Sequence, residues 1–113
     1  MIQINYTVNN KGKHLLTVKG HAGQNAKGQD IVCAGVSTLV TTLVICLNAV
    51  TAKSGMLKKP KIKLEQGDAH IEVTPKTRQR NEVKRAFLQT VIGLEWLAKS
   101  YPEYVKFVTS VKI

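Results

Sequence analysis

Hydrophobic and polar residues alternate over residues 2–8 of the chain. Ile2, Ile4 and Tyr6 are separated by polar residues, and this period of two predicts a half-buried strand over residues 2–8. The Asn-Asn-Lys-Gly stretch that follows is typical of a turn, because Asn and Gly tolerate positive φ angles. Residues 14–18 then have the composition of a returning strand. The pattern therefore predicts a β-hairpin.

A long uncharged segment follows this hairpin. Residues 20–28 hold three glycines and are expected to form a loop, and residues 31–52 carry no charged side chain. Asp30 is a good N-cap residue, so we expect a helix from Asp30 to about Lys53. The segment is long enough to cross a bilayer, but its Ser, Thr and Asn residues and its strand-like flanks favour a buried helix. Because it is apolar nearly all round, we expect either a central helix or a dimer interface.

The second half of the chain repeats the order of elements. Ile62 and Leu64 alternate with lysines, and Ile71 and Val73 follow a Gln-Gly-Asp turn, which predicts a second hairpin. Apolar residues at three- and four-residue spacing predict an amphipathic helix over residues 77–100, and residues 105–113 alternate as a last strand. A chain of 113 residues is one domain by length. We expect a small two-layer α+β domain over residues 1–113, in the order β-β-α-β-β-α-β, with a mostly antiparallel sheet and two helices.

The chain is strongly basic. It has 17 Lys and Arg residues against 7 Asp and Glu residues, and twelve of the basic residues lie within residues 58–113. One cluster comprises Lys58, Lys59, Lys61 and Lys63, and the other comprises Lys76, Arg78, Arg80, Lys84 and Arg85. Such clusters favour an anionic partner such as RNA or the ribosome, or they form a solvated face without a partner. Aromatic residues make up only 5% of the chain, which argues against a platform for stacking single-stranded bases.

The chain has two cysteines, Cys33 and Cys46, and neither belongs to a pattern of metal ligands. We therefore expect no metal and no cofactor. The first ten residues lack the features of a signal peptide. A cytoplasmic protein with free thiols and no membrane span is the resulting expectation.

Cys33 and His21 are the candidate catalytic residues. With Asp30 as the N-cap, Cys33 is the third helical residue, where the unpaired N–H groups and the helix dipole favour a thiolate. His21 lies twelve residues earlier in the glycine-rich loop, which is able to fold back over the helix. The imidazole then acts as base and acid, and the N–H groups at the helix start stabilise an oxyanion. The alternative for Cys33 is a buried apolar side chain, which is what we expect of Cys46; we expect His14 and His70 to be packed or surface residues.

The same residues form a recognisable motif. The motif consists of a G-H-A-G string and, after a short spacer, a G-Q-D-I-V-C-A-G-V-S string: Gly20, His21, Ala22, Gly23 and Gly28 to Ser37. It resembles the signature of the Prp family of ribosomal-processing cysteine proteases. The resemblance implies that His21 and Cys33 form the catalytic dyad and that Asp30 supports it, either by orienting the histidine or by capping the helix. It also implies that Gly20, Ala22, Gly23 and Gly28 belong to a loop that orders around the substrate.

The resemblance further implies a substrate and an assembly. Members of the family remove the N-terminal extension of a large-subunit ribosomal protein of the L twenty-seven type, which supports ribosome assembly, and they form homodimers. Two alternatives stay open. The chain is either a prophage-type relative that processes a phage structural protein, or a non-catalytic RNA- or ribosome-binding module that uses its basic clusters. A purely structural dimer leaves the pairing of His21 with Cys33 unexplained.

Overall fold

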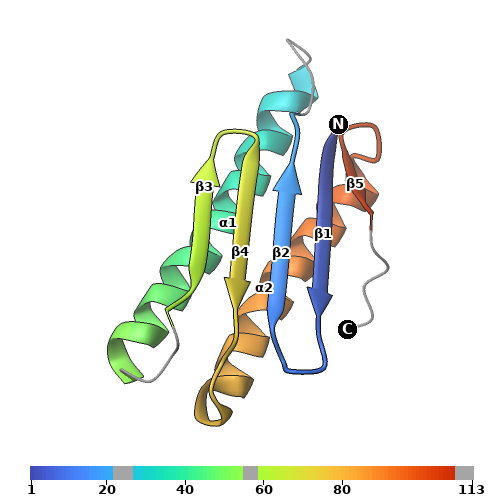
Figure 1. Ribbon diagram of the computed structural model, residues 1–113. Helices are drawn as coiled ribbons and strands as arrows, with labels where there is room; N and C mark the ends of the chain where they lie inside the picture. The colour runs from blue at the N-terminus through green and yellow to red at the C-terminus, as the bar shows by residue number, and fades with distance from the viewer. Residues whose placement is uncertain (22–26, 55–58, 109–113) are drawn as a thin grey trace.

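The fold is described by a computed structural model, which covers residues 1–21, 27–54 and 59–108. The described residues form five strands and two long helices, and Figure 1 shows how they are arranged. In chain order these are β1 (Ile2–Val8), β2 (His14–Lys19), α1 (Lys27–Ser54), β3 (Lys61–Glu65), β4 (Asp68–Val73), the short 3-10 helix η1 (Thr77–Gln79), α2 (Arg80–Ser100) and β5 (Val105–Phe107). The predicted order of strands and helices is therefore confirmed.

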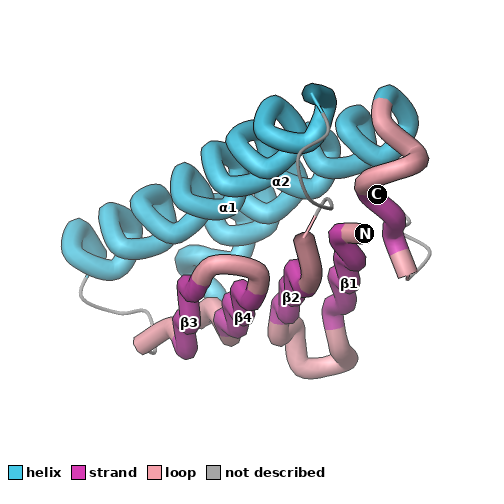
Figure 2. Tube along the Cα trace, turned by 90° about the horizontal axis from the view of Figure 1, so that it is seen from above, coloured by secondary structure: helices cyan, strands magenta, loops and turns pink. Residues whose placement is uncertain are grey.

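The strands form one sheet in the order β3-β4-β2-β1-β5. The pairs β1–β2, β2–β4 and β3–β4 are antiparallel, and β5 pairs with β1 in parallel. Both helices cover the same face of this sheet, and in the part of the chain that the structure describes the opposite face carries no helix (Figure 2). The arrangement is the expected two-layer α+β fold with a mostly antiparallel sheet.

The core lies between the sheet and the two helices. Alternate strand residues point into it, and α1 and α2 each contribute a stripe of apolar side chains at helical spacing. Its largest fully buried side chains are Phe87, Ile4, Leu16, Leu43, Leu47, Ile71 and Leu94. The alternation read from the sequence thus reports which face of each strand the helices cover.

Two glycines allow the helices to approach each other closely. A Cβ atom on Gly35 of α1 would lie 3.2 Å from the Cδ1 atom of Leu97, and one on Gly93 of α2 would lie 2.7 Å from the Cδ2 atom of Leu39. The second distance is shorter than real Cβ contacts. The crossing of α1 and α2 therefore depends on the missing side chain at Gly93.

Helix α1 differs from its prediction in two respects. It begins at Lys27 rather than after Asp30, and it is not buried all round, since Ile31 and Ile45 are 61% and 63% exposed. The sheet covers only one side of the helix, so the central position predicted from its uncharged length is wrong. Residues Ile31–Ala52 have the length and composition of a membrane span. About one third of the most apolar stretch of this segment is buried inside the protein.

The last predicted strand is confirmed over part of its length. Strand β5 comprises Val105–Phe107, and the backbone N–H of Val108 donates to the carbonyl oxygen of Ile4 at 2.8 Å. The remaining residues of that prediction, 109–113, lie outside the described residues. Helix α2 ends at Ser100, directly before the Tyr-Pro pair that follows it in the sequence and disfavours its continuation.

Candidate active site

His21 lies just beyond the end of β2. Gly20 precedes it with a φ of +104°, and a Cβ atom there would collide with the carbonyl oxygen of Met1. The backbone N–H of Gly20 donates to the carbonyl oxygen of Gly67 at 3.0 Å, and the amino group of Met1 donates to the carbonyl oxygen of His21 at 2.5 Å. The backbone that carries the imidazole is therefore held from two sides.

Gly67 in the β3–β4 turn supports the imidazole of His21 directly. Its φ is +76°, a conformation that residues with a side chain rarely adopt. A Cβ atom at Gly67 would lie 2.5 Å from Cε1 and 2.6 Å from Nε2 of His21. The ring therefore packs onto a backbone where only glycine leaves room for it. The sequence indicated a turn at this position, but not this contact.

Cys33 is a half-buried residue of α1 that packs against the core. Because the helix begins at Lys27, Cys33 is its seventh residue and not its third. The prediction that the free N–H groups of the first turn lie at the thiol is therefore wrong, since those groups belong to the first four residues of a helix. The helix start also gives no basis for the expected oxyanion donors beside Cys33.

Cys33 and His21 line the same cavity of about 440 Å³. Its wall on α1 consists of Cys33, Ser37 and the residues that follow them on the same face of the helix. The β3–β4 turn forms the opposite rim. The apolar part of the lining comprises Ile2, Val18, Val36, Val40, Leu64 and Ala69. We call this space the thiol cavity. It contains a thiol, an imidazole and an apolar surface within one site.

The rim of the thiol cavity carries two acidic residues, Glu65 and Asp68. The ammonium group of Lys63 lies 2.8 Å from an oxygen of Asp68 and 3.8 Å from an oxygen of Glu65. The hydrogen bond from Lys63 lowers the pKa of Asp68 and raises that of Lys63. Two of the seven acidic residues of this basic chain thus lie beside the candidate nucleophile.

The other predicted site residues do not all belong to the thiol cavity. Gly20 lines it, whereas Ala22 and Gly23 lie outside the described residues. Gly28 and Asp30 lie in the first turn of α1, so Gly28 does not belong to the loop and Asp30 is not the N-cap. The cap is predicted from residue type, because Asp is a strong capping residue. The helix begins earlier and already includes Gly28, so this prediction is wrong.

The remaining cysteine and the other two histidines lie outside the thiol cavity. Cys46 is exposed on α1, which contradicts its prediction as a buried residue, and both thiols are free. His14 is buried, which agrees with the expectation of a packed residue. His70 lies on the sheet face opposite the helices. Among the described residues, no group of three His, Cys, Asp or Glu side chains is arranged to hold a metal ion.

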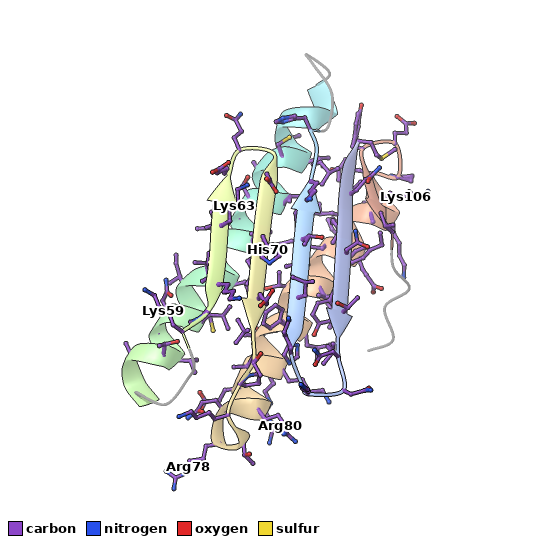
Figure 3. The ribbon with its side chains drawn as sticks, in the orientation of Figure 1. Lys59, Lys63, His70, Arg78, Arg80 and Lys106 are labelled. Atoms are coloured by element: carbon purple, nitrogen blue, oxygen red, sulfur yellow. The ribbon has the colours of Figure 1, made fainter. Side chains whose placement is uncertain are left out.

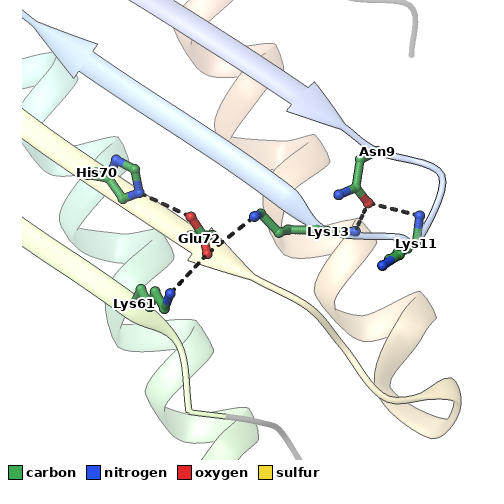
Figure 4. Close-up of polar contacts among 6 residues, drawn as sticks. All are labelled: Asn9, Lys11, Lys13, Lys61, His70 and Glu72. Carbon is green, nitrogen blue, oxygen red and sulfur yellow. Dashed lines mark hydrogen bonds and ion pairs between the residues drawn. The ribbon is translucent and has the colours of Figure 1, made fainter.

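Two lysines of the first basic cluster, Lys61 and Lys63, have acidic partners. On the sheet face opposite the helices, Glu72 lies 3.5 Å from Lys13 and 3.8 Å from Lys61, and its carboxylate lies 3.4 Å from Nε2 of His70 (Figure 4). Partial desolvation opposes ionisation, but the contacts with His70, Lys13 and Lys61 outweigh it and lower the pKa of Glu72. Together with the pairing of Lys63, this makes the part of the first cluster that Lys61 and Lys63 form a solvated, ion-paired surface.

The second basic cluster differs in its surroundings. It lies around η1 and the start of α2, where Figure 3 labels Arg78 and Arg80. Within the parts of the chain that the structure describes, Arg80, Lys84 and Arg85 form no ion pair with an acidic residue. The described residues therefore provide no carboxylate partner for these three cations.

Comparison with known proteins agrees with this site. The chain is 25% identical over 107 residues to the ribosomal processing cysteine protease Prp of Staphylococcus aureus. These residues cover 94% of this chain and 96% of that protein. Its structure is similar to that of the S. aureus protease Prp in complex with a covalently linked product peptide, with a TM-score of 0.70, 25% identity, and 95% and 97% of the two chains covered.

A second solved structure, SMU.848 from Streptococcus mutans, is 28% identical, with a TM-score of 0.68 and coverage of 95% of this chain and 91% of that one. The sequence family described as cysteine protease Prp matches residues 1–106, which is nearly the whole chain. The chain therefore belongs to the Prp family of cysteine proteases.

Proposed function

We propose that this chain is a single Prp-like domain that hydrolyses a peptide bond with Cys33 as nucleophile and His21 as general base and acid. The observation that carries the proposal is that both side chains line one cavity, although they come from different elements. Asp30, in the first turn of α1, is proposed to support the dyad. Gly67, which packs against the imidazole, is proposed to position it.

The proposed reaction proceeds in two steps. His21 accepts the proton of the Cys33 thiol, the sulfur attacks the carbonyl carbon of the scissile bond, and His21 returns the proton to the leaving amine. This releases the C-terminal fragment and leaves the N-terminal fragment as a thioester on Cys33. His21 then deprotonates a water molecule that attacks the thioester, and the sulfur leaves and regains the proton. One water molecule is consumed for each bond cleaved.

The proposed substrate is the N-terminal extension of a large-subunit ribosomal protein of the L twenty-seven type. The ribosomal processing role of the S. aureus relative and the product peptide bound to it support this assignment. The thiol cavity adds a physical argument: its apolar lining suits a hydrophobic substrate residue, and Glu65 and Asp68 attract the basic residues of a ribosomal protein. Processing of a phage structural protein is the alternative that the same experiment separates.

The test is to mix the purified protein with the extended ribosomal precursor and to measure the products by mass spectrometry. We expect one N-terminal trimming event that is lost in Cys33→Ala and retained in Cys46→Ala, since Cys46 is exposed and lies away from the cavity lining. Trimming by Cys33→Ala at the wild-type rate would overturn the proposal. An active enzyme that cleaves only a phage protein would instead assign the alternative substrate.

We also propose that the protein is a cytoplasmic homodimer. Several large apolar side chains are exposed on the helical layer: Ile31, Ile45, Ile92 and Trp96. A second copy that covers them would remove this apolar surface from water. Sedimentation equilibrium tests the assembly, with Ile92→Glu/Trp96→Glu expected to shift it toward the monomer. A wild-type monomer at all concentrations would contradict it.

Contact with RNA is a second proposed role, and the charge distribution assigns it to the second basic cluster rather than the first. Lys61 and Lys63 of the first cluster have carboxylate partners, whereas Arg80, Lys84 and Arg85 have none among the described residues. Neutralising this second cluster should reduce the salt dependence of RNA binding, whereas neutralising Lys61 and Lys63 should change it little. Equal effects of both changes would contradict the assignment.

A further inference from the structure

A second cavity, of about 420 Å³, lies at the opposite end of the β1–β2 hairpin from the thiol cavity. It is enclosed between the turn end of this hairpin and a stripe of residues along α2. Its lining includes Tyr6, Val8, His14, Arg80, Lys84 and Leu88. We call it the cationic cavity. Its volume lies within the range of about 300–1,000 Å³ that is typical of small-molecule sites.

One wall of the cationic cavity is a fixed and uncharged pair of rings. The hydroxyl of Tyr6 lies 2.7 Å from Nδ1 of His14, and both rings stack near Phe87, with centroid distances of 5.7 and 4.7 Å. His14 is only 4% exposed. Burial raises the pKa of Tyr6 to about 12, and burial together with the charge of Lys84 lowers the pKa of His14. Both rings are therefore neutral at physiological pH.

The charged groups that line this cavity are both cations. Arg80 and Lys84 lie four residues apart on α2, so their side chains leave the helix on the same face. The lining contains no carboxylate, and within the described residues neither cation has an acidic partner. Lys84 lines the same cavity as Tyr6 and His14. An anion placed between the two cations would therefore also be close to the rings.

We propose that the cationic cavity binds a nucleotide, either a free mononucleotide or the terminal nucleotide of an RNA strand. A phosphate monoester carries up to two negative charges, and a guanidinium with a neighbouring ammonium complements it. The nucleobase is a flat ring that suits a wall of neutral rings and the aliphatic side chains of Val8 and Leu88. The inference is independent of the proposed protease activity, because the two cavities share no lining residue.

The test is an NMR titration of the full chain with adenosine monophosphate, adenosine and inorganic phosphate. We expect saturable shifts at the amides of Tyr6, Arg80 and Lys84 and not at Gly67. Adenosine monophosphate should bind at least about tenfold more tightly than adenosine or phosphate alone, because only it contacts both the cations and the rings. Equal affinities for phosphate and the nucleotide, or no saturable shifts at these amides, would overturn the proposal.

Matched variants locate the site. Arg80→Gln/Lys84→Gln should weaken the nucleotide about tenfold or more, whereas Lys61→Gln/Lys63→Gln, which removes the same charge from the sheet face, should leave its affinity unchanged. Equal losses would overturn the proposal by showing that binding follows net charge. Circular dichroism checks that both variants are folded. Binding should persist in Cys33→Ala, so a failed protease assignment and a failed nucleotide site are distinguishable.

The source of the ligand is resolved by comparing RNA ends. A short RNA with a 5′-phosphate should bind more tightly than the same RNA with a 5′-hydroxyl if the cavity takes a terminal nucleotide. Stronger binding of free adenosine monophosphate than of either RNA would assign a mononucleotide. In either case, binding must be weaker in Arg80→Gln/Lys84→Gln than in the wild-type protein. RNA binding that ignores both the end group and this substitution would overturn the proposal.

Discussion

The thiol cavity and the cationic cavity occupy opposite ends of the same β-hairpin and have similar volumes, but their chemistry is opposite. The thiol cavity has an acidic rim formed by Glu65 and Asp68, and its two reactive side chains come from the end of β2 and from α1. The cationic cavity has a basic rim, and its imidazole is held by a tyrosine. In a chain with a net charge of +10, the two cavities thus differ in the sign of the charged side chains that line them.

The comparison also separates two kinds of histidine. His14 is buried, hydrogen-bonded to Tyr6 and stacked on Phe87, so its ring is fixed in a neutral environment. His21 is exposed and lies against the bare backbone of Gly67, beside a cavity that also contains a thiol. A base that exchanges protons with a substrate needs this accessibility. The difference in surroundings therefore favours His21 over His14 for the catalytic role.

The largest effect is expected from removing the imidazole of the thiol cavity. His21→Ala should lower kcat by about 10²–10⁴-fold, because the proton transfers lose their base and acid. His70→Ala removes an imidazole from the sheet face, where it contacts only Glu72 among the described polar groups, and should keep the wild-type rate. Steady-state cleavage of the ribosomal precursor measures both variants. A similar loss in the two would remove the distinction between the histidines.

Gly67→Ala tests how the imidazole is positioned. It introduces a Cβ atom into the His21 ring and strains a φ of +76°. Gly12→Ala is the matched control, because Gly12 has a φ of +78° and a Cβ atom added there would have nothing within 4 Å. Both should lose about 1–2 kcal/mol of unfolding free energy. Only Gly67→Ala should also lose cleavage, by about tenfold or more.

Urea unfolding and cleavage assays measure these two effects separately. If both glycine variants lose stability equally and cleave at the same rate, the backbone of Gly67 does not position the histidine.

The buried histidine predicts a specific dependence of stability on pH. Burial and the charge of Lys84 lower the pKa of His14 from its usual value near 6.5. The folded state therefore binds fewer protons at His14 than the unfolded state, so its contribution to stability is complete above about pH 6.5 and is lost as the pH falls toward the folded-state pKa. His14→Gln should lose this dependence.

Urea midpoints between pH 7 and pH 5 measure this slope. The carboxylates with lowered pKa values, Asp68 and Glu72, contribute in a separate window below about pH 4.5. An unchanged slope in His14→Gln would contradict the assignment.

The smallest effect is expected at the second cysteine. Cys46 is exposed on α1, so Cys46→Ala should change the unfolding free energy by no more than about 0.5 kcal/mol. Thermal unfolding measures the change. A loss of about 2 kcal/mol or more would show that the side chain is buried in solution, for example by a second copy of the chain.

Much of the fold could be predicted because the strands alternate so regularly. In β4, the buried residues Ala69, Ile71 and Val73 alternate with polar residues that face away from the helices, and this period is visible in the sequence. The exposure of α1 could not be predicted in the same way. Its uncharged composition suggests burial on every side, whereas the sheet covers only one side of the helix. Cys46 is exposed, so its predicted burial is wrong.

The sequence predicts a candidate reactive pair, which the structure brings to one cavity, but not the contacts that support it. His21 and Cys33 stand out through their residue types and motif. The contact between His21 and Gly67 arises only from the pairing of β2 with β4, where Lys19 lies opposite Asp68. The start of α1 at Lys27 also depends on backbone hydrogen bonding and not on the capping preference of Asp30.

The most direct measurement is the rate at which iodoacetamide alkylates each cysteine, followed by mass spectrometry of the peptides. Cys46 is more exposed than Cys33, so accessibility alone predicts that Cys46 reacts faster. If His21 activates Cys33, Cys33 reacts faster despite its burial, and this advantage disappears in His21→Ala. Faster alkylation of Cys46 in the wild-type protein, with no effect of His21→Ala on Cys33, would contradict the dyad.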